Sequence, residues 1–155
     1  MIIRPHKPED VTTLFQLFFD TVHNVNIQDY TQEQVKAWAP ENFDINRWQN
    51  RTKDYCIFVA EDDSDIVGFA ELEQNGHIDC FYVHHKKQGL GIGHKLMSKL
   101  EQKAKSLELD EIYAEVSITA RPFFERKGFK VMQKQTVSLR GQRLTNYKMS
   151  KPLSN

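Results

Sequence analysis

The sequence from residue 77 to residue 94 reads HIDCFYVHHKKQGLGIGH, and it decides the fold. Residues 77–83 are rich in aromatic and β-branched side chains, which is typical of a strand. Apolar residues then recur every three or four positions, which predicts a helix that begins in the glycine cluster; they are Ile92, Leu96, Leu100, Ala104 and Leu107. The first amides of a helix have no internal partner and carry partial positive charge. Because Gly91 and Gly93 leave those amides accessible, the loop predicts an anion site.

Two better-known glycine motifs do not match this loop. A phosphate-binding loop of the type G-x-x-x-x-G-K-[ST] needs a glycine five residues after Gly89, where the chain has His94. The dinucleotide motif G-x-G-x-x-G fails because His94 and Leu96 stand where its last glycine belongs. A nucleotide-binding protein of the phosphate-loop class is therefore the weakest hypothesis, and a loop that only turns the chain is the structural alternative.

Local signals on both sides of the loop define the architecture. Apolar spacing predicts a helix over residues 11–22, Thr31 and Gln34 form a capping box before a second helix, and Asp44 caps a short turn. Asn75-Gly76 predicts a hairpin. Further strands are predicted at 56–60, 66–73, 111–116, 129–139 and 143–149, and a short helix at 119–127. The sequence thus predicts one α/β (mixed α+β) domain over residues 1–155, with a central twisted mixed sheet of six to seven strands flanked by about four helices.

Composition excludes several classes of protein. With 39% hydrophobic residues, ten Phe and no net charge, the chain is not intrinsically disordered. Its longest apolar run has six residues, whereas a membrane span needs roughly 20. No secretory signal is visible at its start. Cys56 and Cys80 form neither a disulfide framework nor a metal-ligand set, so we expect two free thiols, no metal and a cytoplasmic location.

Charge is balanced over the whole chain but not along it. Residues 1–75 carry a net charge of −8 and residues 76–155 a net charge of +8. This polarity argues against a nucleic-acid-binding protein with a chain-wide basic surface. It suits a protein whose second half meets a small polyanion and whose first half attracts a cation.

Three segments with matching spacing resemble a known family. Residues 88–93, QGLGIG, resemble the [Q/R]-x-x-G-x-[G/A] pyrophosphate motif of the GNAT superfamily of acetyl-CoA-dependent N-acetyltransferases. Residues 78–83 resemble the strand before that loop, and residues 120–129, ARPFFERKGF, resemble the family's A-x-x-[FL]-Y-x-x-x-G-F segment. Element order agrees over essentially the whole chain. Residues 30–48 and 140–147 are further similar to a subgroup of small, mostly uncharacterised bacterial acetyltransferases.

The resemblance implies a GNAT-like fold and direct transfer of an acetyl group from acetyl-CoA to a primary amine of a small-molecule or peptide acceptor. Amides of the glycine loop would hold the pyrophosphate, with Lys86, Lys87 and Lys95 flanking it, and main-chain groups of the preceding strand would pair with the pantetheine arm. Ser117 stands where the family often has an Asn. The cofactor-binding residues implied are Phe81, Tyr82, Val83, Gln88, Gly89, Leu90, Gly91, Ile92, Gly93, Ser117 and Phe124.

The general base is a choice among three residues. In a regular strand, residues 77, 79, 81 and 83 share one face, which places His77 and Asp79 side by side as the first candidates. Glu115, near the end of its strand, is the third candidate, and Glu71 and Glu73 are weaker ones. By the same alternation Cys80 falls on the opposite face and is expected to be inert.

The general acid poses a separate problem. Phe124 stands where the family often has the Tyr that protonates the departing thiolate, and a phenyl ring has no proton to give. The acid would then be Tyr82, Ser117, Tyr147 or water, or the step would run without an acid. The missing hydroxyl also motivates an alternative function, a non-catalytic module that binds or senses acyl-CoA.

The resemblance places the acceptor pocket between the first two helices and the final strand pair. Aromatic residues in that region are Tyr30, Trp38, Phe43 and Trp48, and acidic residues among them are Asp29, Glu33, Glu41 and Asp44. Such a pocket suits an amine with an apolar body, because cations favour aromatic faces. The alternative is that both tryptophans pack in the core. An exposed edge strand near the C-terminus would also allow a homodimer to form.

Overall fold

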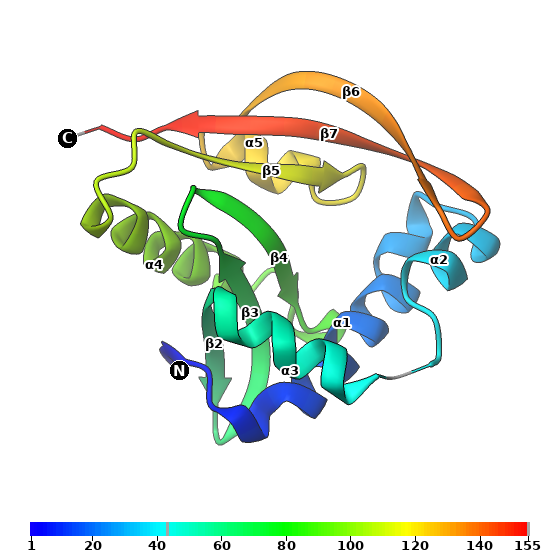
Figure 1. Ribbon diagram of the computed structural model, residues 1–155, viewed down its shortest axis with the longest axis horizontal. Helices are drawn as coiled ribbons and strands as arrows, with labels where there is room; N and C mark the ends of the chain where they lie inside the picture. The colour runs from blue at the N-terminus through cyan, green and yellow to red at the C-terminus, as the bar shows by residue number, and fades with distance from the viewer. Residues whose placement is uncertain (43, 155) are drawn as a thin grey trace.

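The chain is described by a computed structural model that covers residues 1–42 and 44–154. Figure 1 shows a curved sheet with helices packed along it. The strands are β1 (Ile2–Pro5), β2 (Cys56–Asp62), β3 (Asp65–Leu72), β4 (His77–Val83), β5 (Glu111–Ser117), β6 (Lys130–Leu139) and β7 (Gln142–Pro152). The helices are α1 (Val11–Asn24), α2 (Gln32–Trp38), α3 (Ile45–Asp54), α4 (Ile92–Ser106) and α5 (Arg121–Arg126). None of the described helices is long and apolar enough to cross a membrane.

The strands form one mixed sheet in the order β1-β2-β3-β4-β5-β7-β6. Its only parallel neighbours among the described strands are β4 and β5, and their pairing is short: it joins His77 to Tyr113 and Ile78 to Ala114, and then the two strands separate. Figure 1 shows β5, β7 and β6 diverging from β2, β3 and β4 beyond this point. The predicted mixed sheet is confirmed, and the separation leaves space between its two central strands.

Two apolar layers hold the helices to the sheet. On one face the stripe of α4 packs against β2–β5, with Leu96 and Leu100 fully buried. On the other face Leu14 and Phe15 of α1 and Trp48 of α3 pack against β2 and β3. The α4 stripe ends sooner than predicted, because Leu107 caps the helix and is 37% exposed.

The predicted helix caps are confirmed. The amide of Gln34 donates to Oγ1 of Thr31 over 3.1 Å, and the amide of Thr31 donates back to Oε1 of Gln34 over 2.8 Å. Asp44 accepts a hydrogen bond from the amide of Arg47. It caps a ten-residue helix, α3, rather than the short turn expected from the sequence. The sequence pattern also gave no sign of β1, a four-residue edge strand that pairs with β2.

Candidate functional site

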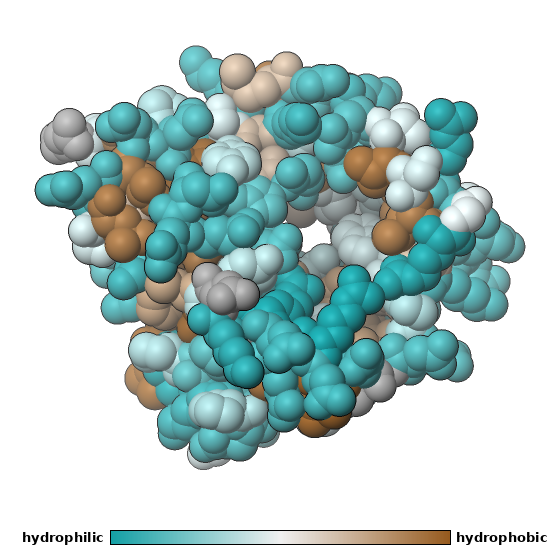
Figure 2. Space-filling view, in the orientation of Figure 1, coloured by the Kyte–Doolittle hydropathy of each residue, from teal (hydrophilic) through white to brown (hydrophobic). Residues whose placement is uncertain are grey.

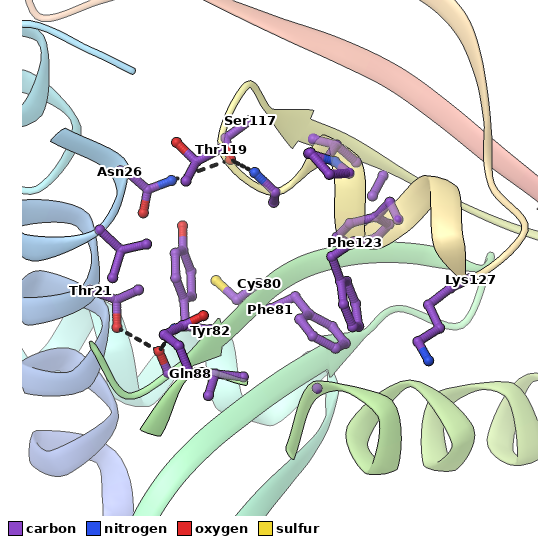
Figure 3. Close-up of a pocket in the computed structure, with 18 of the residues that line it drawn as sticks. Thr21, Asn26, Cys80, Phe81, Tyr82, Gln88, Ser117, Thr119, Phe123 and Lys127 are labelled. Atoms are coloured by element: carbon purple, nitrogen blue, oxygen red, sulfur yellow. Dashed lines mark hydrogen bonds between the residues drawn. The ribbon is translucent and has the colours of Figure 1, made fainter. Parts of the chain in front are cut away.

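The separation of β4 from β5 opens into a cavity of about 460 Å³. Figure 2 shows the molecule hollowed near the centre of this face, and Figure 3 shows side chains from α1, β4, β5 and α5 around the space. The cavity reaches from Tyr82 and Ser117 at the strand ends to the loop before α4 and to α5. It therefore joins the predicted glycine loop to the predicted catalytic strand.

The loop before α4 has the geometry of an anion site. Gly91 is the residue before the helix and has φ +83°, and Gly89 has φ +76°, so both lie in the left-handed region that other residues avoid. Both line the cavity. The side chain of Gln88 is held in place by a hydrogen bond, because its Nε2 donates to the carbonyl of Val83 over 2.7 Å. Leu90 instead points to solvent, with 65% of its surface exposed.

Basic side chains line the same end of the cavity. Lys87, His94, Arg126 and Lys127 are among its lining residues, and Nζ of Lys127 lies 2.7 Å from Nδ1 of His94. Lys86 and Lys95, predicted to flank the loop, are exposed and are not among the described lining residues. This end of the cavity is suited to a polyanion.

Among the described residues of the cavity wall, one buried polar atom lacks a hydrogen-bond partner. Oγ1 of Thr119 has no hydrogen-bond partner among the described residues, although it is buried and its residue lines the cavity. Buried hydroxyls are nearly always hydrogen-bonded in folded proteins. An unpaired hydroxyl in a cavity of this size fits a bound ligand that supplies the missing partner.

The prediction from strand alternation is wrong, because β4 contains a bulge. Cys80 pairs with Glu71 and Ile78 pairs with Leu72, so Asp79 has no partner in β3. The extra residue reverses the alternation: Ile78 packs with α4, whereas Cys80 packs with α1 on the other face. Asp79 consequently lies beside Cys80 and not on a shared face with Phe81. Bulges often re-aim side chains next to active sites.

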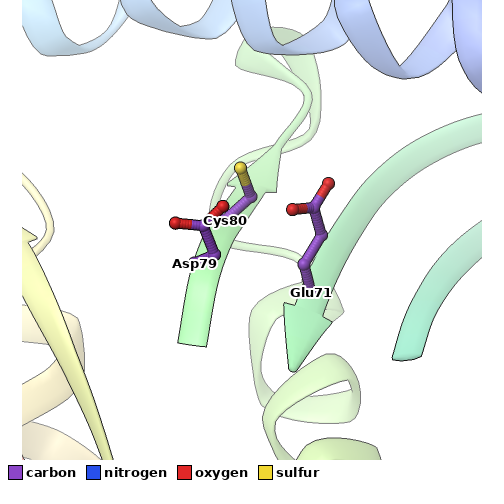
Figure 4. A group of neighbouring side chains, drawn as sticks. All are labelled: Glu71, Asp79 and Cys80. Atoms are coloured by element: carbon purple, nitrogen blue, oxygen red, sulfur yellow. The ribbon is translucent and has the colours of Figure 1, made fainter. Parts of the chain in front are cut away.

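The bulge brings Asp79 into a cluster that the sequence pattern did not reveal. Figure 4 shows Glu71 of β3 facing Asp79 and Cys80 of β4. A carboxylate oxygen of each acid and the sulfur of Cys80, which are atoms of the kind that bind metal ions, lie within 4.8 Å of one another. Nη2 of Arg51, from α3, lies among them: it donates to Oε2 of Glu71 over 2.7 Å, to Asp79, and to Sγ of Cys80 over 3.1 Å. A guanidinium therefore lies between three groups whose spacing alone could suit a metal ion.

Burial dominates the chemistry of this cluster. Glu71 is fully buried, and burial raises its pKa to about 6 although Arg51 opposes the shift. Burial also raises the pKa of the Cys80 thiol well above its ordinary value. Cys80 therefore stays a neutral thiol, although it lines the cavity.

His77 lies between two carboxylates. Its Nε2 is 2.5 Å from Oε2 of Glu115, and its Nδ1 contacts Glu73. Burial opposes a charge on the ring, but the hydrogen bonds to Glu115 and Glu73 outweigh burial and raise the pKa of His77. His77 is not among the described residues that line the cavity, whereas Glu115 is. Of the predicted bases, Glu115 and Asp79 thus reach the cavity, and His77 contacts it through Glu115.

Tyr82, Ser117 and Phe124 all lie at the cavity wall. Burial raises the pKa of the Tyr82 hydroxyl well above its ordinary value, so the hydroxyl keeps its proton. Oγ of Ser117 accepts from the amide of Ala120 over 3.0 Å and from Nδ2 of Asn26 over 3.2 Å, as Figure 3 shows. Phe124 is 3% exposed and packs edge-on against Phe81.

A second cavity of about 200 Å³ adjoins the first between α2, the ends of β4 and β5, and the β6–β7 hairpin. This is where the resemblance placed the acceptor. Five of the described residues line both cavities and mark their junction: Trp38, Asp79, Tyr82, Glu115 and Ser117.

The predicted acceptor residues separate in the structure. Trp38 lines both cavities, and Tyr30 lines the smaller one while its hydroxyl donates to the carbonyl of Thr145 over 2.6 Å. Trp48 is 7% exposed and packs against Phe15 in the core, with Arg51 over its ring, so its predicted place in the pocket is wrong. Phe43 lies outside the described residues.

The acids of the smaller cavity differ from those predicted. Its carboxylates are Asp79 and Glu115, and the predicted acids Asp29, Glu33, Glu41 and Asp44 are not among its described lining residues. The expectation that the first half of the chain attracts the cation is thus wrong for this site. Strand pairing, not proximity in sequence, brings the two acids together.

Comparisons with known proteins agree with this geometry. Residues 26–151 match the model of the acetyltransferase (GNAT) domain family. An uncharacterised N-acetyltransferase, YafP of Escherichia coli (strain K12), is 32% identical over 147 residues, which cover 95% of this chain and 93% of that protein.

Solved structures extend the likeness. A GCN5-related N-acetyltransferase from Rhodopseudomonas palustris superposes with a TM-score of 0.94 at 32% identity, covering 98% of this chain and 95% of that one. The PaiA N-acetyltransferase from Thermoplasma acidophilum, solved with coenzyme A, has a TM-score of 0.80 at 22% identity, covering 98% and 99%. These matches confirm the resemblance seen in the three sequence segments, and the chain belongs to the GNAT family of acetyltransferases.

Proposed function

We propose that the protein transfers an acetyl group from acetyl-CoA to a primary amine. The observation that carries this proposal is the large cavity, which opens between β4 and β5 and has the amide end of α4 and four basic side chains at one end. Two relatives of the same fold, PaiA and a putative acetyltransferase from Salmonella typhimurium, were solved with coenzyme A and acetyl-CoA.

The residues present fit acetyl-CoA as the co-substrate. The amides from Gly89 to Gly93 would hold the pyrophosphate, and the main chain of β4 beyond Ile78, free of pairing to β5, would bind the pantetheine arm. The unpaired hydroxyl of Thr119 would gain a partner. Acetyl-CoA supplies an activated acetyl thioester.

In the reaction a C–N bond forms to the acetyl carbonyl carbon and the C–S bond breaks. One proton must leave the amine nitrogen, because an ammonium with a pKa of about 10 cannot attack. Glu115 reaches the junction of the two cavities and is the group we assign to accept it, with His77 as a positioning residue that holds Glu115. Asp79 lies at the same junction, held by Arg51, and attracts the ammonium.

The amine nitrogen loses its second proton as the amide forms, and the departing sulfur takes up one proton. An acid that protonates the sulfur regains its own proton from that nitrogen. Tyr82 reaches the junction and keeps its proton at neutral pH, so it can supply what Phe124 cannot. A hydroxyl at this point removes the motive for the non-catalytic alternative, which rested on Phe124. The comparisons also favour an enzyme over a binding module.

Calorimetry and thiol release test the proposal together. Acetyl-CoA titrated into the folded protein should bind with measurable heat, and a primary amine should then accelerate release of the CoA thiol. Absence of heat would overturn the cofactor site. Binding without thiol release over a broad amine panel would instead support the non-catalytic module.

Two substitutions test the assigned roles. Glu115→Gln should lower kcat by about 10²-fold, whereas Glu111→Gln on the same strand, outside the described cavity linings, should leave it unchanged. Tyr82→Phe removes only the hydroxyl and should lower kcat by roughly tenfold or more without changing the Kd of acetyl-CoA. A kcat within a few-fold of wild type for either variant would remove that residue from its role.

A further inference from the structure

We infer that the acceptor is a small primary amine whose body is apolar and carries no carboxylate, and that it binds in the smaller cavity. This inference rests on the proposed function and deepens it. It follows from the size of that cavity, from the charge of its wall and from the hydrogen bonds that its polar side chains have already made.

The size of the cavity favours a small molecule. Its volume is about 200 Å³, below the roughly 300–1,000 Å³ of sites for drug-sized ligands. One side is formed by Trp38 of α2 and by apolar side chains of the final hairpin, namely Val137, Leu139 and Leu144. Leu144 is 5% exposed and belongs to a buried cluster with Val35 of α2, so this wall is firmly packed.

The charge of the wall is of one sign. Asp79 and Glu115 lie at the junction with the large cavity, and no Lys or Arg is among the residues described as lining the smaller one. An ammonium placed at the junction meets two carboxylates. A carboxylate on the same acceptor would lose its water and find no cation, which is costly. The basic residues of the site lie instead at the cofactor end of the large cavity, such as Lys127.

Several polar atoms of the wall are already hydrogen-bonded within the protein. The Tyr30 hydroxyl donates to the carbonyl of Thr145 and accepts from the amide of Ile118, and Oδ1 of Asn146 accepts from Nε2 of Gln135. An acceptor with many hydroxyls, such as an aminosugar, would therefore leave polar groups unpaired. Away from the junction, the wall is formed mainly by apolar side chains and ring faces, namely those of Val137, Leu139, Leu144, Tyr30 and Trp38.

The first experiment measures thiol release with matched amines and the wild-type protein. Along the series from n-butylamine to n-octylamine, kcat/KM should rise with chain length until the cavity is full and then fall. 2-Phenylethylamine should exceed phenylalanine, which adds only a carboxylate, by about 30-fold or more. It should exceed glucosamine by a similar factor. Equal or faster acetylation of phenylalanine or glucosamine would overturn the inference.

Failure of the inference and failure of the proposed function give different results. If acetyl-CoA binds by calorimetry but no member of the alkylamine series accelerates thiol release, the acceptor class is wrong and the cofactor site stands. If acetyl-CoA does not bind, the proposed function itself falls.

A second experiment introduces a cation into the apolar wall. Val137 of β6 lines the cavity. Val137→Arg should lower kcat/KM for 2-phenylethylamine at least tenfold, and it should reduce the preference for 2-phenylethylamine over phenylalanine. Val131→Arg, on the same strand but 37% exposed and outside the described lining, is the matched control and should change neither value. Acetyl-CoA binding should be the same in both variants. Unchanged discrimination in a Val137→Arg protein that binds acetyl-CoA would contradict the assignment of this wall.

Discussion

At the scale of single residues, the site depends on where charge is held. His77 lies between Glu73 and Glu115, and those two hydrogen bonds favour its charged form despite burial. Arg51 likewise lies between Glu71 and Asp79. Each cation is hydrogen-bonded to a carboxylate at the junction of the two cavities: His77 to Glu115, and Arg51 to Asp79. These charge-assisted hydrogen bonds hold the two acids in place.

The raised pKa of His77 predicts how its contribution to stability depends on pH. A group whose pKa is higher in the folded than in the unfolded chain stabilises the fold below the unfolded pKa of about 6.5, and loses this effect as pH rises through the folded pKa. His77→Gln should therefore cost more free energy of unfolding at pH 6 than at pH 9. Urea denaturation of both proteins at the two pH values measures the difference.

His84 supplies a control of opposite sign. Burial, and then the neighbouring His85, lower the pKa of His84. Its charged form is therefore disfavoured in the fold, and stability is lost as pH falls. His84→Gln should cost less free energy of unfolding at pH 6 than at pH 9. If the loss of unfolding free energy changes in the same direction with pH for both variants, the raised pKa assigned to His77 is wrong.

At the scale of elements, Arg51 of α3 adds hydrogen bonds to the apolar packing that joins this helix to the sheet. Arg51 reaches from α3 to β3 and β4, and its guanidinium also lies 5.0 Å from the centre of the Trp48 ring. The bulge in β4 turns Asp79 toward this guanidinium. The contacts that α3 makes with β3 and β4 thus decide where the Asp79 carboxylate lies at the junction of the two cavities.

Removing Arg51 should separate a structural effect from a positioning effect. Arg51→Met leaves the fully buried Glu71 without its cation and should lower the free energy of unfolding by about 3 kcal/mol. Adding Glu71→Gln removes the unpaired carboxyl and should restore at least half of that loss. Both variants lack the hydrogen bond from Arg51 to Asp79. The KM for the amine should therefore remain raised in the double variant. Equal instability of the single and double variants would show that Glu71 is not the source.

At the scale of the whole molecule, the site is divided by charge. Basic residues lie at the end of the large cavity nearest α4 and α5, and Asp79 and Glu115 lie at its junction with the smaller cavity. A polyanionic co-substrate and a cationic acceptor are therefore attracted to opposite ends of one continuous space. The two meet at the ends of β4 and β5.

Reversing one charge at the basic end tests this division. Lys127→Glu should raise the Kd of acetyl-CoA by about tenfold at low ionic strength, and added salt should reduce the difference. Lys105→Glu is a control with the same charge change in the last turn of α4, away from the loop. Calorimetry measures both. Similar Kd values for the two variants would mean that net charge, and not the position of Lys127, governs binding.

The sequence alone determined the features that depend on neighbours along the chain. The Thr31–Gln34 cap, the Asn75-Gly76 hairpin and the start of α4 at the glycine loop each depend on a few adjacent residues. The family could be identified from the sequence because its motif lies within one such loop. The order of elements then led to the mixed sheet.

Only the tertiary structure decided which side chains meet. The bulge at Asp79 arises from the register between β3 and β4, and it reverses the alternation on which the first choice of base depended. Arg51 reaches Asp79 across 28 residues, and Trp48 packs in the core whereas Trp38 lines both cavities. These contacts depend on strand register and helix packing between distant segments, and such long-range pairing leaves no signal in the local spacing of residues.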